Sequence, residues 1–251
     1  MIDTHAHLHL IDRPTSDVLN AAKAAGVQHV VQVAIDVASI HQNLAEFVNL
    51  PNCSITGGIH PLSVTKEMVL DDVLALLEQH VDQFVAIGEI GLDYKYGLDN
   101  ADLQQLFFKA QLNLAREHCM PVIIHSRHSD EDMLGIVNQY PDVKKVFHCY
   151  ATNAAFFDAL EGDQNYASFT GMVTYAKKGK VINAMKHIPF NRLMIETDSP
   201  YLTPKDVLVA QNSPEHVGHI AQHMADHRGL ELHDVINQTT TNALTFFNIQ
   251  L

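Results

Sequence analysis

The chain has 251 residues, of which 47% are hydrophobic, and its formal net charge is −13 with histidine taken as neutral. This length can bury a large core, whereas the acidic balance argues against a broad basic surface that binds duplex nucleic acid without specificity. No run of about 18 apolar residues predicts a membrane span, and no basic segment followed by an apolar stretch predicts a secretory signal.

The first expected strand, residues 1–7, ends in two histidines, His5 and His7. Because side chains alternate along a strand, both imidazoles lie on the same face. Two imidazoles pointing the same way offer two nitrogen ligands to one cation. Histidine makes up 17 of the 251 residues, so the pair alone is weak evidence, and ligand-type residues at the ends of later strands strengthen it.

The rest of the chain alternates strand patterns with helix patterns, and several helices are followed by glycine or proline. Further strands are expected at residues 30–35, 53–59, 84–87, 121–124, 145–147, 166–169 and 192–195. Helices are expected at about residues 15–25, 36–48, 66–80, 102–118, 130–139, 153–160, 175–187, 214–227 and 232–247.

About eight strands that alternate with helices predict an α/β fold with a parallel sheet. Such a run closes most simply as a TIM (β/α)8 barrel, whose active site lies at the C-terminal ends of the strands. The absence of a linker, a low-complexity tract or a composition shift predicts a single domain over residues 1–251. The alternative is an open doubly wound sheet, but no Gly-x-Gly-x-x-Gly follows the first strand, which counts against a dinucleotide-binding version.

On the barrel hypothesis, six side chains of metal-ligand type meet at one rim. They are His5, His7, Glu89, His125, His148 and Asp198. Imidazoles and carboxylates together suit borderline divalent cations such as Zn²⁺ or Mn²⁺. Six ligands exceed what one tetrahedral ion needs, so two ions about 3.5–4 Å apart with a carboxylate between them fit better. Two divalent ions and two carboxylates together leave a net positive charge. This charge favours an anionic substrate such as a phosphate.

Five segments carry these residues: His5-Ala6-His7, Gly88 to Tyr94, Ile124 to Arg127, Phe147 to Cys149, and Glu196 to Leu202. In these segments, and over essentially its whole length, the chain resembles the TatD family of metal-dependent deoxyribonucleases, within the amidohydrolase superfamily. The resemblance implies a TIM barrel with one or two metal ions. It implies that His5, His7, Glu89 and Asp198 hold one ion and that Glu89, His125 and His148 hold the other.

Three positions depart from the family pattern. Leu62 stands two residues after His60, where the family often has a histidine, and Tyr150 begins a run where a glycine-bearing turn is usual. Residues 207–214 keep Asn212 and Pro214 but lack the basic run that many members carry. Together with the net charge, this loss counts against polymeric DNA as the substrate.

The leading hypothesis is a metal-dependent hydrolase that cleaves phosphodiester bonds, with the 3′–5′ exonuclease-like action on DNA that the resemblance implies. Asp198 is the expected general base, and Glu89 is expected to fix the spacing of two divalent ions, which are Zn, Mg or Mn. The candidate substrate contacts are His60, Arg127, Tyr94, Asn212, Lys95, Lys177 and Tyr201.

Two other functions stay open at this point. The same site could hydrolyse a small phosphoester, lactone or amide, or the barrel could bind metal without catalysis. We expect a monomer that acts on DNA or a small phosphoester without contacting a membrane. Three widely spaced cysteines, Cys53, Cys119 and Cys149, fit buried thiols in a reducing cytoplasm.

Overall fold

The computed structural model describes residues 1–251 and contains one sheet of eight parallel strands in the order β1 to β8. The strands are β1 (Ile2–Ala6), β2 (His29–Gln32), β3 (Cys53–Gly57), β4 (Phe84–Asp93), β5 (Val122–Arg127), β6 (Lys145–Phe147), β7 (Asn165–Phe169) and β8 (Leu193–Ile195).

Backbone contacts join the first strand to the segment after the last one. The amide of Asp198 donates to the carbonyl of His5 at 2.9 Å, and the amide of His7 donates to the carbonyl of Ser199 at 2.8 Å. The Thr4 hydroxyl donates to the carbonyl of Ile195 at 3.0 Å. These bonds bring the sheet round into a barrel, so the TIM-barrel prediction is confirmed and the open doubly wound alternative is wrong.

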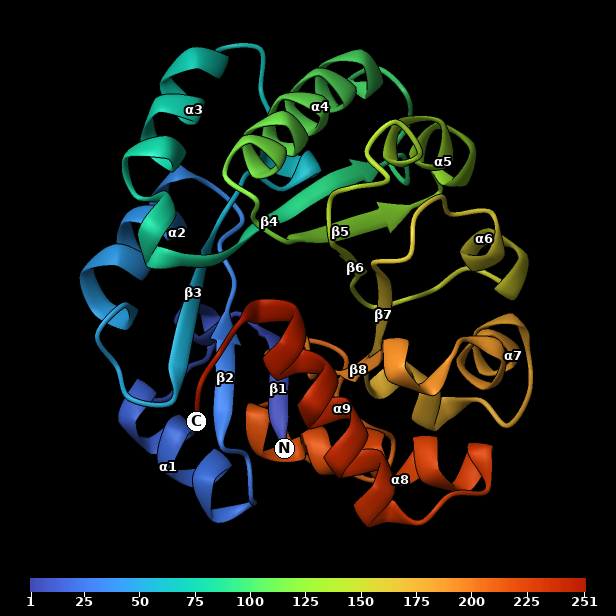
Figure 1. The fold of residues 1–251 in the computed structure, drawn as a ribbon. Helices are drawn as coiled ribbons and strands as arrows, with labels where there is room; N and C mark the ends of the chain where they lie inside the picture. The colour runs from blue at the N-terminus through green and yellow to red at the C-terminus, as the bar shows by residue number, and fades with distance from the viewer.

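Nine α-helices surround the strands (Figure 1). They are α1 (Thr15–Ala24), α2 (Val37–Gln42), α3 (Leu70–Gln79), α4 (Ala101–Glu117), α5 (Asp130–Val137), α6 (Ala154–Asp158), α7 (Lys180–His187), α8 (Val217–Arg228) and α9 (Leu232–Phe247). None of these helices combines the length and the apolar character needed to cross a bilayer.

The core has two parts, one between the strands and the outer helices and a smaller one inside the barrel. The inner part includes Ile2, Val31 and Met194, and three residues of α9 pack against it: Ala243, Phe246 and Phe247. Helix α9 therefore closes the end of the barrel where the strands begin, as its position in Figure 1 shows. The opposite rim, where the strands end, is left open for chemistry.

Some elements differ from their predicted bounds. Strand β4 continues to Asp93 instead of ending at 87, because residues 90–93 pair with residues 124–127 of β5. The helix expected from residue 66 begins at Leu70, and the one expected from residue 175 begins at Lys180, after the 3-10 helix Gly171–Tyr175.

Candidate metal centre

All six predicted ligands lie at the rim formed by the C-terminal ends of the strands. His5 lies within β1, Glu89 within β4 and His125 within β5. His7, His148 and Asp198 follow β1, β6 and β8 by one, one and three residues. Because the strands are parallel and the sheet closes on itself, positions distant in sequence meet here.

Two pairs of imidazoles face each other through their ring nitrogens. The Nε2 atoms of His5 and His7 are 3.2 Å apart, and the Nδ1 atom of His125 is 3.2 Å from the Nε2 atom of His148. Lone pairs that face each other at this distance repel unless a proton or a cation lies between them. Each pair thus has the arrangement of two nitrogen ligands directed at one ion.

Glu89 lies between the two pairs and is almost completely buried, with 2% of its surface exposed. Its Oε1 atom is 2.9 Å from His125 Nδ1 and 2.7 Å from His148 Nε2. Its Oε2 atom is 3.3 Å from His5 Nε2 and 3.9 Å from His7 Nε2. One carboxylate oxygen therefore faces each imidazole pair, which is the geometry of a ligand shared by two ions.

Asp198 completes the group around His5 and His7. Its Oδ1 atom is 3.5 Å from His7 Nε2 and 3.7 Å from His5 Nε2. Ligand atoms of His5, His148 and Asp198 all lie within 4.8 Å of one another, as do those of His5, His7 and Glu89. These nitrogen and carboxylate ligands suit divalent cations. No lysine or arginine lies among them to balance the carboxylate charge in place of a metal ion.

The cluster shifts the pKa values of its own members. Burial acts to raise the pKa of Glu89, but the charge of His148 and hydrogen bonds from His125 and His148 leave it well below its usual range. Burial acts to lower the pKa of His148, but Glu89 and Glu196 raise it well above its usual value. Glu89 therefore stays ionised and negative at neutral pH, as a metal ligand must.

Two acceptors outside the six ligands, Asp93 and the carbonyl of Val33, hold histidine rings, and Glu196 lies beside a third ring. Asp93 Oδ2 is 3.0 Å from His125 Nε2, and Glu196 Oε1 is 3.3 Å from His148 Nδ1. The carbonyl of Val33 is 3.2 Å from His7 Nδ1. Acceptors of this kind fix the ring orientation and tautomer of metal-binding histidines. Sequence reasoning assigned no role to Asp93 or Glu196, although both lie in segments quoted for the family resemblance.

His60 lies beside the cluster, with its Nε2 atom 3.5 Å from Glu89 Oε1. Its Nδ1 atom accepts a hydrogen bond from the amide of Leu62 at 3.1 Å, which leaves Nε2 to carry the proton. Burial lowers the pKa of His60 to about 4, so its ring is neutral at physiological pH. His60 could therefore donate to Glu89 or to a bound substrate.

Two of the predicted substrate contacts lie in the wrong place for that role. The Tyr94 hydroxyl donates to Asp132 at 2.9 Å and accepts from Gln105 at 3.0 Å, away from the cavities beside the cluster. Asn212 is completely buried, and its amide donates to the carbonyls of Thr197 and Tyr201. Since its oxygen also accepts from the Ser213 amide, Asn212 has no free group for a substrate and instead holds the loop that carries Asp198.

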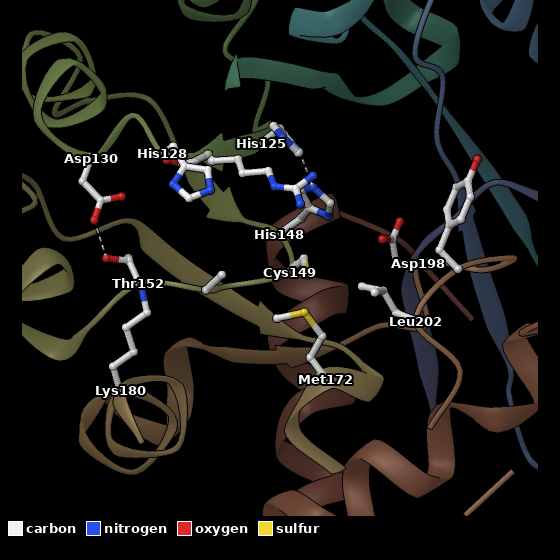
Figure 2. Close-up of a pocket in the computed structure, with 14 residues that line it drawn as sticks. His125, His128, Asp130, His148, Cys149, Thr152, Met172, Lys180, Asp198 and Leu202 are labelled. Atoms are coloured by element: carbon white, nitrogen blue, oxygen red, sulfur yellow. Dashed lines mark hydrogen bonds between the residues drawn. The ribbon is translucent and has the colours of Figure 1, made fainter. Parts of the chain in front are cut away.

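Two cavities adjoin the cluster, one on each side. The large cavity, of about 750 Å³, lies over the ends of β5 to β8, and the small cavity, of about 490 Å³, lies over the ends of β1 to β4. Five residues line both cavities: His125, Arg127, His148, Asp198 and Tyr201. Figure 2 shows Asp198, His125 and His148 at the edge of the large cavity. Neither cavity is lined by Lys95 or Lys177, whereas Lys180 lines the large one.

Comparison with known proteins agrees with this architecture. A family model described as "TatD related DNase" matches residues 2–248. This chain belongs to the TatD-related DNase family. The sequence prediction of the family, and of a metal-dependent hydrolase, is confirmed.

Individual relatives support the same assignment over nearly the full chain. The "Uncharacterized metal-dependent hydrolase YabD" of Bacillus subtilis is 32% identical, with 99% of each chain covered. The "3'-5' ssDNA/RNA exonuclease TatD" of Salmonella typhimurium is 30% identical, covering 93% of this chain and 92% of that one. The crystal structure of the TatD homologue YjjV from Escherichia coli has a TM-score of 0.88 and 25% identity, covering 100% of this chain and 98% of that one.

Proposed function

We propose that this TatD-family enzyme removes nucleotides from the 3′ end of single-stranded DNA or RNA, and that its cofactors are two divalent cations. The observation that carries the proposal is the pair of facing imidazoles on each side of Glu89. In this proposal His5, His7, Glu89 and Asp198 would hold one ion. Glu89, His125 and His148 would hold the other.

Two divalent cations held there would supply a nucleophilic water at neutral pH and neutralise charge on the phosphoryl oxygens. Asp198 lines both cavities and its side chain is 14% exposed, so it can accept the proton of an attacking water as the phosphoester bond breaks. Glu89 fixes the separation of the two imidazole pairs. Arg127, at the border of both cavities, is placed to contact a phosphate of the strand next to the reacting one.

The nucleic-acid substrate is supported by the printed name of the Salmonella relative and by the space on both sides of the cluster. A strand can pass through the cluster only if each side of the reacting bond has room. No observation on this chain favours a lactone or an amide, and the hydrolase family counts against a non-catalytic barrel.

We also propose that residues 1–251 act as one domain and one cytoplasmic monomer. All eight strands belong to one sheet, and the three cysteines are free thiols, which suits a reducing compartment. Only Cys53 is buried as expected, whereas Cys119 is exposed and Cys149 is partly exposed. Sedimentation at micromolar concentration tests the monomer, and a dimer would contradict it.

The test of the proposed function is release of nucleotides from a single-stranded oligonucleotide by protein of known metal content. Asp198→Asn should lower kcat by about 10²–10⁴-fold, the range lost when a general base is removed. Glu89→Gln should lower the bound metal as well as kcat. Asp71→Asn, an exposed position in α3, is the matched control and should behave as wild type. The proposal fails if the loaded protein cleaves no nucleic acid, or if both variants match the wild type.

A further inference from the structure

The two cavities beside the metal centre differ in charge. Arg127 lines both, and the only other lysine or arginine on either wall is Lys180, which lines the large cavity. The small cavity instead adds Glu89 and Asp93 to the shared Asp198. A second anionic group of a substrate is therefore better accommodated on the side of the large cavity.

Both cations of the large cavity are available to a ligand. Lys180 and Arg127 are exposed, and neither side chain has a carboxylate oxygen within 4.0 Å. Asp130, the other carboxylate of this cavity besides Asp198, accepts a hydrogen bond from the Thr152 hydroxyl at 2.7 Å. In Figure 2, Lys180 extends from the start of α7 towards Thr152, on the wall opposite Asp198.

The large cavity also offers apolar surface. Met172 and Leu202 line it, and Figure 2 shows Met172 between Lys180 and Leu202, with Leu202 next to Asp198. An apolar wall next to an anion-binding lysine suits a nucleoside whose base or sugar packs against the wall while its outer phosphate reaches the lysine.

We propose that the large cavity binds the nucleotide adjoining the reacting bond, and that Lys180, with Arg127, binds the next phosphate along the strand. The substrate class is then an oligonucleotide with two consecutive phosphates, and an ester with a single phosphate is a poor substrate. This inference rests on the proposed phosphodiesterase function. It adds a requirement that the metal centre alone does not impose, because the metal centre acts on one phosphate.

The experiment compares kcat/KM for three thymidine dinucleotides: one without a terminal phosphate, one with a 5′-phosphate and one with a 3′-phosphate. One of the two phosphorylated forms should be cleaved about 10-fold more efficiently than the unphosphorylated form. The reason is that its added phosphate gains a charge-assisted contact with Lys180 and Arg127. In Lys180→Gln this ratio should fall to about 2–3-fold, with Arg127 providing the remainder. Lys180→Arg should keep most of the preference, because it retains the charge.

Lys178→Gln is the matched control, since Lys178 is exposed, lies two residues away and lines neither cavity. Its ratio should equal that of the wild type. Equal cleavage of all three dinucleotides, or an unchanged ratio in Lys180→Gln, would overturn the inference and leave the phosphodiesterase function standing. Cleavage of no dinucleotide and no oligonucleotide would overturn both.

Discussion

Asp93 is a buried carboxylate whose only imidazole partner is His125, at 3.0 Å. Burial acts to raise its pKa, but hydrogen bonds from His125 and the Lys95 amide lower it, so Asp93 is ionised at neutral pH. With Nε2 bound to Asp93, the Nδ1 atom of His125 is directed towards Glu89 and His148. The orientation of this proposed ligand thus depends on a residue that need not touch a metal ion.

We predict that Asp93→Asn weakens metal binding and lowers kcat/KM by about 10–100-fold, the usual cost of losing a partner of a metal-binding histidine. Calorimetric titration with Zn²⁺ or Mn²⁺ and assays on a single-stranded oligonucleotide measure the two effects. Asp72→Asn, in the exposed first turn of α3, serves as the control. Wild-type metal affinity in Asp93→Asn would show that His125 is held without it.

At the residue scale, the six converging side chains were predictable because each stands near the expected end of a strand, although β4 continues four residues past Glu89. The roles of Asp93 and Glu196 were not predictable, because strand periodicity does not say which histidine lies opposite on the next strand. Tyr94 and Asn212 were misplaced for a related reason. A position near the rim can be read from sequence, but the direction of its side chain depends on neighbours such as Asp132 and Thr197.

His29, at the start of β2, provides a pH-dependent prediction far from the metal centre. It is buried against Ser54, with 2.8 Å between Nε2 and Oγ, and burial lowers its pKa to about 4 from 6.5. Between these values the unfolded chain binds a proton that the folded chain does not. Protonation over this range therefore favours the unfolded chain, and the free energy of unfolding decreases as the pH falls from 6.5 towards 4.

The wild type should lose about 1 kcal/mol more free energy of unfolding than His29→Gln between pH 7 and pH 5, after allowance for partial solvent screening. Urea denaturation at both pH values measures this difference. His233→Gln, at a site with 71% exposure, is the control and should follow the wild type. Parallel losses in wild type and His29→Gln would mean that His29 takes up its proton in the folded state.

At the scale of elements, α2 is a short helix whose start is fixed by a capping box. The Asp36 side chain accepts from the Ser39 amide at 2.7 Å, and the Ser39 hydroxyl accepts from the Asp36 amide at 2.9 Å. Asp36→Ala should lower the free energy of unfolding by about 1 kcal/mol, as loss of an N-cap does. Asp17→Ala, inside the first turn of α1 and without a cap bond, should cost less. Equal losses of unfolding free energy in the two variants, measured by urea denaturation, would contradict a stabilising role of the Asp36 cap.

Most elements were predictable from periodicity and from glycine or proline punctuation, and β6 and α9 have the predicted bounds. Strand β4 was underestimated because Gly88 and Gly91 lower strand propensity, which pairing with β5 overrides. Gly91 is required there, since its φ is +143° and an added Cβ would lie 2.0 Å from the carbonyl oxygen of His125. Such a close approach of two backbones depends on tertiary packing, and a single sequence does not reveal it.

At the scale of the whole molecule, the net charge of −13 disfavours binding of a nucleic-acid strand. The chain can bind such a strand only if lysine and arginine side chains are concentrated at the binding site. The walls of the two cavities carry Arg127 and Lys180 as their only lysine or arginine side chains. Apart from the metal ions, a bound strand can therefore release few counterions from its phosphates. On the proposed function, this arrangement predicts a weak salt dependence of the reaction.

With two phosphate contacts from side chains, a slope of about −0.7 per contact for single strands gives about a sevenfold loss of affinity between 50 and 200 mM salt. We predict this loss in kcat/KM for a single-stranded oligonucleotide, measured relative to bis(4-nitrophenyl) phosphate. Both substrates would present their scissile phosphate to the same metal centre, so the ratio isolates the contacts to the rest of the strand. In Lys180→Gln the loss should shrink to about 2–3-fold, because one contact is removed. A loss beyond about 100-fold would require several more cations along the strand than these cavities provide, and would place the binding surface elsewhere on the molecule.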